Sequence, residues 1–520
     1  MQNTKMRTKS LDIAFFTRQS LAQTSRIDPN VGAIGLEDDE PLTYSQLASA
    51  VRRYANSLIN LGVEPRRRVG LLMSNSVQYW IAYFSITRIG AIAVRLNFRL
   101  SREELRFAIK DSGISVLLAD PDLLEPIEPI RDELGVETYL AFGPAPPWTL
   151  DWNILERGND NEPDIALPTA DSPAMIMYTS GTTGHPKGAL WTHSSTTWWT
   201  AMQLMEWNFT SSSVTMVTGP LYHIGALENY SLPTLAAGGR VVLLRSKGFN
   251  IDRTLQIASN QGVTDLLLFP SMIYQMLQSR RALKDIDLGR LSRIFTGGDS
   301  LLPSASNELL RRYPWIDLIQ VYGLTEGTPV AACGSPGFAR VHPESVGRPF
   351  PFCEVSIRDD DGRSVESGVS GEIWTRSPAN AAGYWENPEA SAATFVNGWC
   401  KTGDIGVIED GFLRIAGRKK DMIRSGGENI YPAEIEDVLL RHSKIADAAV
   451  IGIPDATYIE AVCAIVVPTE GAAITEAEVI EHCGEYLAGY KKPKRVIFVP
   501  EIPRTPSQKI MKYRLREMYG

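Results

Sequence analysis

The sequence predicts a large α/β body followed by a smaller α+β domain. Residues 42–120 alternate between helix-like and strand-like segments, and a second long region of the same kind runs to residue 376. The last hundred residues change to a different, mixed pattern. We therefore expect two subdomains of sheet and helix and a small β-rich subdomain in the body, with a separate C-terminal unit.

The first region consists of helices and nearly continuous apolar strands. Leu47, Val51, Tyr54 and Leu58 stand at helical spacing, and this helix stops at Gly62. The next elements are a strand over 68–74, a helix over 77–89, a strand over 91–96, a helix that Ser101 and Glu104 cap and Gly113 ends, and a strand over 114–120. This order predicts a parallel sheet with helices on both faces.

A stretch rich in Pro, Asn and Asp over 141–172 joins this region to the next. Strands are predicted there over 238–244, 264–270 and 292–298, with helices between them. Strand-like segments over 353–362 and 371–376 predict the β-rich subdomain.

The C-terminal unit has its own pattern. We expect a helix over 432–441 with Pro432 in its first turn, strands over 447–454, 461–468 and 495–500, and a helix capped by Thr475 and Glu478. The charged, glycine-bearing join over 417–429 suits a mobile hinge. We therefore divide the chain into residues 1–418 and 419–520.

Composition bounds the class of protein. At 520 residues the chain exceeds a small binding module, and 52 basic against 60 acidic residues favour no polyanionic partner such as nucleic acid. Its five cysteines form no C-x-x-C pair, which indicates a reducing compartment. We find no secretory signal, no address signal at the C-terminus and no apolar run long enough for an integral membrane segment, so a cytoplasmic location is expected.

The segment YTSGTTGHPKGA, residues 178–189, concentrates hydroxyls, glycines and one lysine after an apolar strand. Hydroxyls and exposed backbone amides suit an oligophosphate, and an ammonium adds compact positive charge. A flexible polar loop is the alternative. The residues concerned are Thr179, Ser180, Gly181, Thr182, Thr183, Gly184 and Lys187.

Further motifs follow in order: PLYHIG at 220, TGGDS at 296, QVYGLTEG at 320, TGD at 402, GRKKDMIRSGGENIYPAEIE at 417 and PRTPSQK at 503. With this ordered set, the whole chain resembles the adenylate-forming superfamily of acyl-CoA synthetases, carrier-protein adenylation domains and luciferases. It is most similar to bacterial fatty-acyl-CoA synthetases. The resemblance implies a large N-terminal body with a C-terminal lid, a carboxylate that attacks the α-phosphorus of ATP, and Mg²⁺.

The resemblance also implies roles for single residues in the body. The loop from Thr179 to Lys187 would hold the pyrophosphate end of ATP, with Thr182 and Glu326 as metal ligands. Asp404 would accept both ribose hydroxyls, and Arg418 would make a second ribose or phosphate contact. The segments around the adenine and phosphates would contribute Gly298, Asp299, Ser300, Gln320, Tyr322, Gly323 and Thr325. Ordinary turn, core or surface positions are the alternative for these residues.

Lys509 matches the lysine of the family that bridges the incoming carboxylate and the α-phosphate. This chain departs from the family pattern immediately before it, where Gln508 replaces the usual glycine. Lys420 falls at the hinge position, and Gly426 and Gly427 suit the close approach of a pantetheine arm, or a simple glycine pair before the next helix. The segment SGGEN followed by YPAEIE is typical of acyl-CoA synthetases, so the resemblance makes CoA the expected acceptor.

His223 stands where the family has a gate at the acid pocket, although an isolated histidine also suits a structural role. The segment LYHIGALEN has no Asp to pair with a substrate ammonium, which favours an acid without an α-amine. Trp198 and Trp199 suit either the pocket or the core.

Three hypotheses follow. The first is an acid:CoA ligase that converts a fatty or aromatic carboxylic acid, ATP and CoA through an acyl-adenylate. The second is an amide ligase that passes the same adenylate to an amine, and the third is a non-catalytic acyl-nucleotide binding protein. Nothing in the sequence predicts the oligomeric state.

Overall fold

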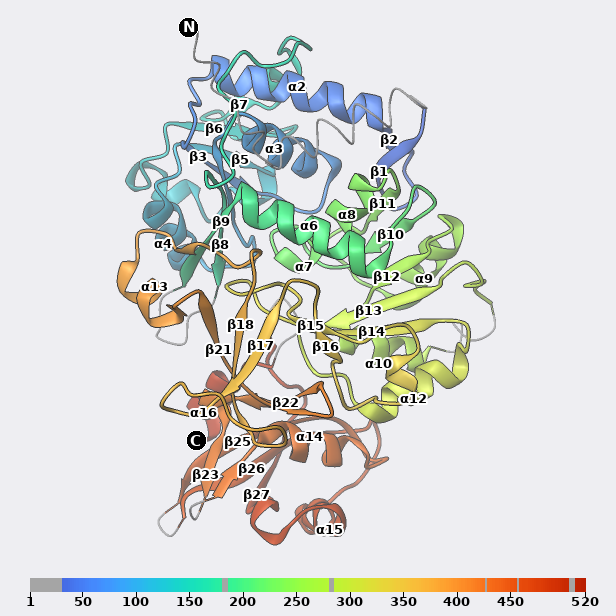
Figure 1. Cartoon of the computed structure of the whole chain (residues 1–520). Helices are drawn as coiled ribbons and strands as arrows, with labels where there is room; N and C mark the ends of the chain where they lie inside the picture. Colours follow the sequence, from blue (N-terminus) through green and yellow to red (C-terminus); the bar gives the residue numbers. More distant parts are fainter. Residues whose placement is uncertain (1–29, 180–185, 280–284, 426–427, 456–457, 505–509) are drawn as a thin grey trace, which may run out of the picture.

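The computed structural model describes residues 30–179, 186–279, 285–425, 428–455, 458–504 and 510–520. Three sheets build the upper and middle parts of the molecule in Figure 1, and a fourth lies in the C-terminal unit below them. The predicted fold class is confirmed: two large sheets with helices, one small β-rich sheet and one α+β unit.

The eight-stranded sheet has the order β19-β9-β8-β4-β3-β5-β6-β7. Its predicted strands β3, β4 and β5 pair in parallel, and Ser101 and Glu104 form the predicted capping box. The elements are β3 (Arg68–Leu72), β4 (Ile92–Arg95), β5 (Val116–Ala119), β6 (Thr138–Ala141), β7 (Leu150–Asp151), β8 (Pro173–Thr179), β9 (Lys187–Thr192) and β19 (Gly383–Tyr384), with α2 (Tyr44–Asn60), α3 (Val77–Arg88), α4 (Arg102–Ser112) and α5 (Asn153–Glu156).

The nine-stranded sheet has the order β16-β15-β14-β13-β12-β10-β11-β1-β2. The first strand β1 pairs in parallel with β11, and Ile34 lies opposite Val241. The strands are β1 (Gly32–Leu36), β2 (Leu42–Thr43), β10 (Val214–Val217), β11 (Arg240–Leu243), β12 (Asp265–Leu267), β13 (Arg293–Gly297), β14 (Asp317–Tyr322), β15 (Ala332–Cys333) and β16 (Arg348–Pro349). The helices of this region are α6 (His193–Trp207), α7 (Ile224–Leu227), α8 (Ser231–Ala236), α9 (Ile251–Asn260), α10 (Pro270–Gln278) and α12 (Pro303–Arg312).

Two smaller sheets complete the chain. The β-rich sheet contains β17 (Glu354–Arg358), β18 (Gly371–Arg376), β20 (Phe395–Val396), β21 (Trp399–Glu409) and β22 (Phe412–Arg418), with α13 (Pro388–Thr394) beside it. The last sheet contains β23 (Ile423–Ser425), β24 (Glu428–Ile430), β25 (Ile445–Asp455), β26 (Ile459–Pro468) and β27 (Arg495–Phe498), with α14 (Pro432–Leu440), α15 (Glu476–Tyr486) and α16 (Lys512–Tyr519). Thr475 and Glu478 form the second predicted capping box.

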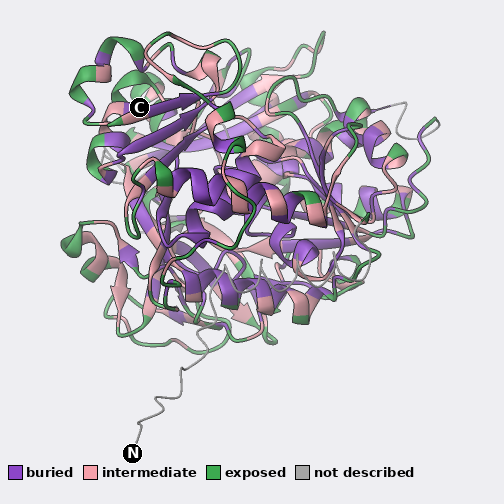
Figure 2. Ribbon diagram, turned by 90° about the horizontal axis from the view of Figure 1, so that it is seen from above, coloured by how far each residue is buried: buried purple, intermediate pink, exposed green. Residues whose placement is uncertain are grey.

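Buried residues fill the central strands and helices of the body, as Figure 2 shows. Trp199 is fully buried, and Trp207 stacks on Tyr230 with ring centroids 5.1 Å apart. Trp198, by contrast, is 38% exposed on α6 and meets Phe352 edge to face. Trp199 therefore belongs to the core. Trp198 lies at the surface and not in the core, and a place for it in the acid pocket stays a prediction.

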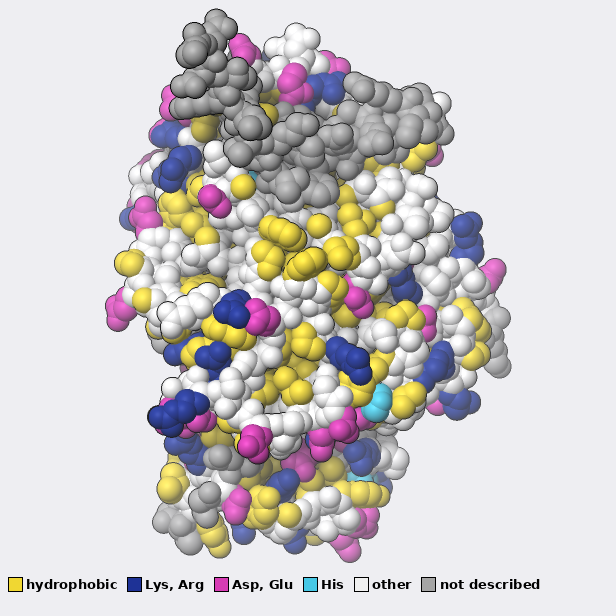
Figure 3. Space-filling view, viewed as in Figure 1, with side chains coloured by type: hydrophobic (Ala, Val, Ile, Leu, Met, Phe, Trp, Pro, Cys, Tyr) yellow, Lys and Arg dark blue, Asp and Glu magenta, His cyan; other side chains and the backbone are white. Residues whose placement is uncertain are grey.

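Apolar side chains gather in the middle of the face that carries α6, as Figure 3 shows. Among the described residues, no helix is both long and apolar enough to cross a bilayer. All five cysteines are buried free thiols.

Candidate functional site

The site lies where the carboxyl edges of the two large sheets meet. Strands β10, β12, β13 and β14 run parallel, so the segments that follow them leave the sheet at one edge. His223, Gly298 and Glu326 stand in these segments. In the other sheet, β8 ends at Thr179, whose Oγ1 donates a hydrogen bond of 2.6 Å to Oε1 of Glu326. This contact joins the two edges directly.

Glu326 is held by hydroxyl donors from two strands of the eight-stranded sheet. Besides Thr179, the hydroxyl of Tyr384 on β19 donates to Oε1 of Glu326 at 3.2 Å. Burial, with the nearby Glu326 carboxylate as a second cause, raises the pKa of Tyr384 and keeps its hydroxyl protonated as a donor. Since both contacts use the same oxygen, the carboxylate keeps lone pairs for a hard cation such as Mg²⁺.

The backbone beside Glu326 is fixed as well. The indole of Trp191 on β9 donates to the carbonyl oxygen of Thr325 at 2.9 Å, and the amide of Ala381 donates to the carbonyl oxygen of Glu326 at 3.0 Å. Sequence reasoning missed both Trp191 and Tyr384, since neither stands in a recognised motif. Their positions beside Glu326 follow from the pairing of β19 with β9.

Lys187 begins β9 at the same edge. Its Nζ lies 5.3 Å from the ring centroid of Tyr384, within cation–π range. The predicted phosphate-loop residues Ser180, Gly181, Thr182, Thr183 and Gly184 lie outside the described residues, as do Gly426, Gly427 and Lys509.

Asp404 lies at the meeting of the nine-stranded sheet and the β-rich sheet. The hydroxyl of Tyr322 donates to its Oδ2 at 2.9 Å, and Nε of Arg418 pairs with its Oδ1 at 2.9 Å. Asp404 and Arg418 are directly opposite in the hairpin of β21 and β22. Burial and the Asp404 carboxylate raise the pKa of Tyr322, so its hydroxyl stays protonated. The carboxylate is thereby oriented, with capacity on each oxygen for one further donor.

The remaining predicted nucleotide residues follow β13 and β14. Gly298 has a φ of +85°, and Ser300 donates its amide to Oδ1 of Asp299 at 2.9 Å. The side-chain amide of Gln320 donates a hydrogen bond to the carbonyl oxygen of Pro343 at 3.0 Å. Packing explains why position 323 is a glycine, because a Cβ there would lie 2.3 Å from the carbonyl oxygen of Pro329.

His223 immediately precedes α7, at the end of the segment that follows β10. It is partly exposed, and its ring lies 4.5 Å from that of Tyr222. Phe269 connects this segment with the one after β13: added Cβ atoms at Gly219 and Gly298 would meet its ring at 3.3 and 3.6 Å. The structure therefore brings His223 to the same edge as the predicted nucleotide residues.

Ion pairs flank Lys420 on both sides. Nζ of Lys419 lies 2.8 Å from Asp360 in the β-rich subdomain, and Asp421 pairs with Arg516 of the last helix at 2.8 Å. Partial burial lowers the pKa of Lys420. One neighbour is thus tied to the body and the other to the C-terminal unit.

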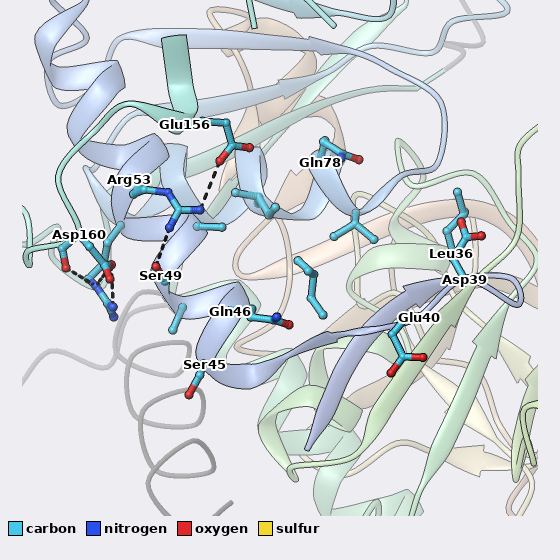
Figure 4. Close-up of a pocket in the computed structure, with 16 residues that line it drawn as sticks. Leu36, Asp39, Glu40, Ser45, Gln46, Ser49, Arg53, Gln78, Glu156 and Asp160 are labelled. Atoms are coloured by element: carbon cyan, nitrogen blue, oxygen red, sulfur yellow. Dashed lines mark hydrogen bonds and ion pairs between the residues drawn. The ribbon is translucent and has the colours of Figure 1, made fainter. Parts of the chain in front are cut away.

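A cavity of about 1010 Å³ lies elsewhere, beside α2 (Figure 4). Four of its charged side chains pair with one another: Arg53 lies 3.3 Å from Glu156, and Arg52 lies 2.7 Å from Asp160. Of the predicted site residues that the structure describes, none lines this cavity.

Comparisons with known proteins identify the family of the chain. The pattern of the family described as "AMP-binding enzyme" matches residues 21–385, and that of "AMP-binding enzyme C-terminal domain" matches residues 434–509. The chain is 37% identical to an indoleacetate–CoA ligase of Aromatoleum aromaticum, over 95% of this chain and 96% of that protein. It is 34% identical to the long-chain-fatty-acid–CoA ligase FadD13 of Mycobacterium tuberculosis, over 96% of this chain and 98% of that protein.

Its structure is similar to the crystal structure of the anthranilate CoA ligase AuaEII in complex with anthranoyl-AMP. The TM-score is 0.89, the identity 28%, and the match covers 96% of both chains. On these matches and the ordered motifs, the chain belongs to the family of AMP-binding enzymes.

Proposed function

We propose that the protein is an ATP-dependent acid:CoA ligase for a fatty or aromatic carboxylic acid. A carboxylate oxygen of the acid attacks the α-phosphorus of ATP, the bond to pyrophosphate breaks, and acyl-AMP forms. The sulfur of CoA then attacks the acyl carbon, and AMP leaves. The single observation that carries the proposal is that residues 322–326 connect the two pairs of candidate residues, in a chain similar to CoA ligases. Glu326 accepts a hydrogen bond from Thr179, and Tyr322 donates one to Asp404, which pairs with Arg418.

Each predicted residue has a part in this proposal. Asp404 accepts the ribose hydroxyls, and Arg418 orients that carboxylate and faces the phosphates. Glu326 and Thr182 would hold Mg²⁺, which would neutralise charge on the phosphates when bound. Lys187 adds a positive charge at the pyrophosphate end, and His223 gates the acid. The partners of Glu326 and Asp404 support these roles, because they fix the carboxylates before a ligand arrives.

We further propose that residues 1–418 form the catalytic body and residues 419–520 a lid that pivots at Lys420. The opposed ion pairs of Lys419 and Asp421 support this pivot. In one position of the lid, Lys509 serves adenylation. In the other, Gly426 and Gly427 face the pantetheine arm of CoA. The cytoplasmic location predicted from the sequence stays a prediction.

The acid is proposed from the relatives. The names of the compared proteins include indoleacetate, anthranilate and long-chain fatty acids, all with an apolar body. The test is pyrophosphate release across a panel of such acids, each with CoA, with an amine, or with neither. Thioester formed with CoA supports the proposal. Amide formed without thioester would favour an amide ligase, and ATP binding without turnover of any acid would favour the non-catalytic alternative.

A further inference from the structure

Arg95 and Glu228 form an ion pair whose side chains are both 0% exposed. Nη1 of Arg95, at the end of β4, lies 2.6 Å from both carboxylate oxygens of Glu228. The same nitrogen lies 3.5 and 3.3 Å from the sulfurs of Met175 and Met177. Burying two charges among such groups costs several kcal/mol per ion before their attraction offsets it. A pair of this kind contributes little net stability, so stability alone does not account for it.

The other arm of the Arg95 guanidinium binds the segment that carries His223. Nη2 donates to the carbonyl oxygen of His223 at 2.9 Å and to that of Leu221. His223 is the N-cap of α7 and Glu228 is its C-cap. A single guanidinium from the eight-stranded sheet therefore holds both ends of a short helix that belongs to the nine-stranded sheet.

Asn75 completes this attachment from the same side. Its side-chain amide donates to the carbonyl oxygen of Gly219 at 3.0 Å, and its Oδ1 accepts from the amide of Leu221 at 2.8 Å. The backbone of residues 219–223 is thus held by two buried side chains of the other subdomain. Local sequence has little control over this loop, because both side chains stand more than a hundred residues earlier in the chain.

We propose that Arg95 and Glu228 are positioning residues that set His223 and α7 against the acid, without touching the acid themselves. This inference rests on the proposed acid-activating function. The planar guanidinium matters because it reaches Glu228 with one nitrogen and two carbonyl oxygens with the other, which a lysine ammonium cannot do at once. Loss of the pair lets the loop carrying His223 move relative to β4.

The test compares steady-state pyrophosphate release in Arg95→Lys, Glu228→Gln and a matched control, Arg293→Lys. Arg293, which is partly buried, forms an ion pair with the buried Asp265 at the starts of β13 and β12, the opposite edge of the sheet from the site. We expect the KM for the acid to rise at least tenfold in the first two variants while the KM for ATP stays within twofold. The control should change neither constant. Equal rises for acid and ATP, or no rise for acid, would overturn the proposal.

Two further measurements separate positioning from general damage. When His223→Ala is already present, Arg95→Lys should change the KM for the acid less than twofold further. If the effects of the two substitutions on this KM instead multiply, they are independent, and the proposal is contradicted. If a single variant does not fold, the double variant Arg95→Met/Glu228→Leu, which removes both charges, should still raise the KM for the acid. An unchanged KM there also overturns the inference. If the wild-type protein releases pyrophosphate with none of the acids in the panel, the proposed function itself is refuted instead.

Discussion

The hydroxyl of Thr179 and the carboxylate of Glu326 are 2.6 Å apart, although 147 positions separate the two residues in the chain. One stands at the end of β8, in the eight-stranded sheet, and the other follows β14, in the nine-stranded sheet. The hydrogen bond therefore fixes Glu326, the proposed metal ligand, relative to β8, the strand that leads into the predicted phosphate loop.

Thr179→Val should lower kcat/KM for pyrophosphate release about 10- to 100-fold. The reason is the loss of a hydrogen bond to a charged acceptor, worth about 1.5–3 kcal/mol, at nearly unchanged side-chain volume. Thr179→Ser keeps the hydroxyl and serves as the control, with an expected loss below threefold, or about 0.6 kcal/mol. Equal loss in both variants would argue against a role for the hydroxyl.

Asp404→Asn should raise the KM for ATP about tenfold or more, with a smaller effect on the KM for the acid. The substitution keeps the shape but removes the charge that faces Arg418, and the ribose loses a charged acceptor. Tyr322→Phe removes only the donor to Oδ2, so its effect should be a few-fold at most. An unchanged KM for ATP in Asp404→Asn would show that the ribose binds elsewhere.

Stability should fall as the pH is lowered from about 6.5 to 4, in part because of one histidine. His193 is fully buried, and burial lowers its pKa from 6.5 to about 4. Between these pH values the unfolded chain binds the proton and the folded chain does not. The contribution of the neutral His193 to the free energy of unfolding is therefore fully present above the unfolded pKa and is lost as the pH falls below it. The contribution amounts to about 2–3 kcal/mol at pH 4.5.

Urea denaturation at pH 7 and pH 4.5 measures this difference. In His193→Gln, which cannot take up the proton, the decrease in unfolding free energy between the two pH values should be smaller by that amount. A decrease as large as in the wild type would assign the pH dependence to other groups.

Lys509→Ala should abolish pyrophosphate release while largely sparing thioester formation from supplied acyl-adenylate. In the proposed mechanism this lysine stabilises the charge that develops at the α-phosphate only in the first step. The two half-reactions are measured separately by pyrophosphate release and by thioester formation. Equal loss of both would refute this division of labour.

Lys420→Pro should slow thioester formation more than adenylation, because proline restricts the backbone torsion at the proposed pivot. Lys420→Ala is the control, since it removes the charge and leaves the backbone free. If proline leaves thioester formation unaltered, the pivot lies at another residue.

Local signals carried most of the fold prediction. The capping boxes of Ser101 with Glu104 and Thr475 with Glu478 both form, because each pair lies three residues apart and needs no distant partner. The pairing of Ile34 with Val241 was missed, since an isolated apolar strand carries no information about which sheet it joins.

The same distinction holds for the site. Asp404 and Glu326 stand in short motifs that predict them as site residues, whereas Tyr384 has no motif and reaches Glu326 only through the pairing of β19 with β9. Arg95 and Glu228 are 133 positions apart, and each alone has the appearance of an ordinary charged residue in an apolar surrounding. Contacts of this kind depend on tertiary structure, which periodicity does not encode.

The place of β1 in the nine-stranded sheet has a consequence for synthesis on the ribosome. Its neighbour β11 is translated about 200 residues later, which at ~5–20 residues per second means a delay of roughly 10–40 s. During that interval the apolar segment GAIGL has emerged without its parallel neighbour. The body of the enzyme therefore cannot close from its N-terminus onward, and the nascent chain has to keep its first strand from pairing wrongly until the second sheet begins to form.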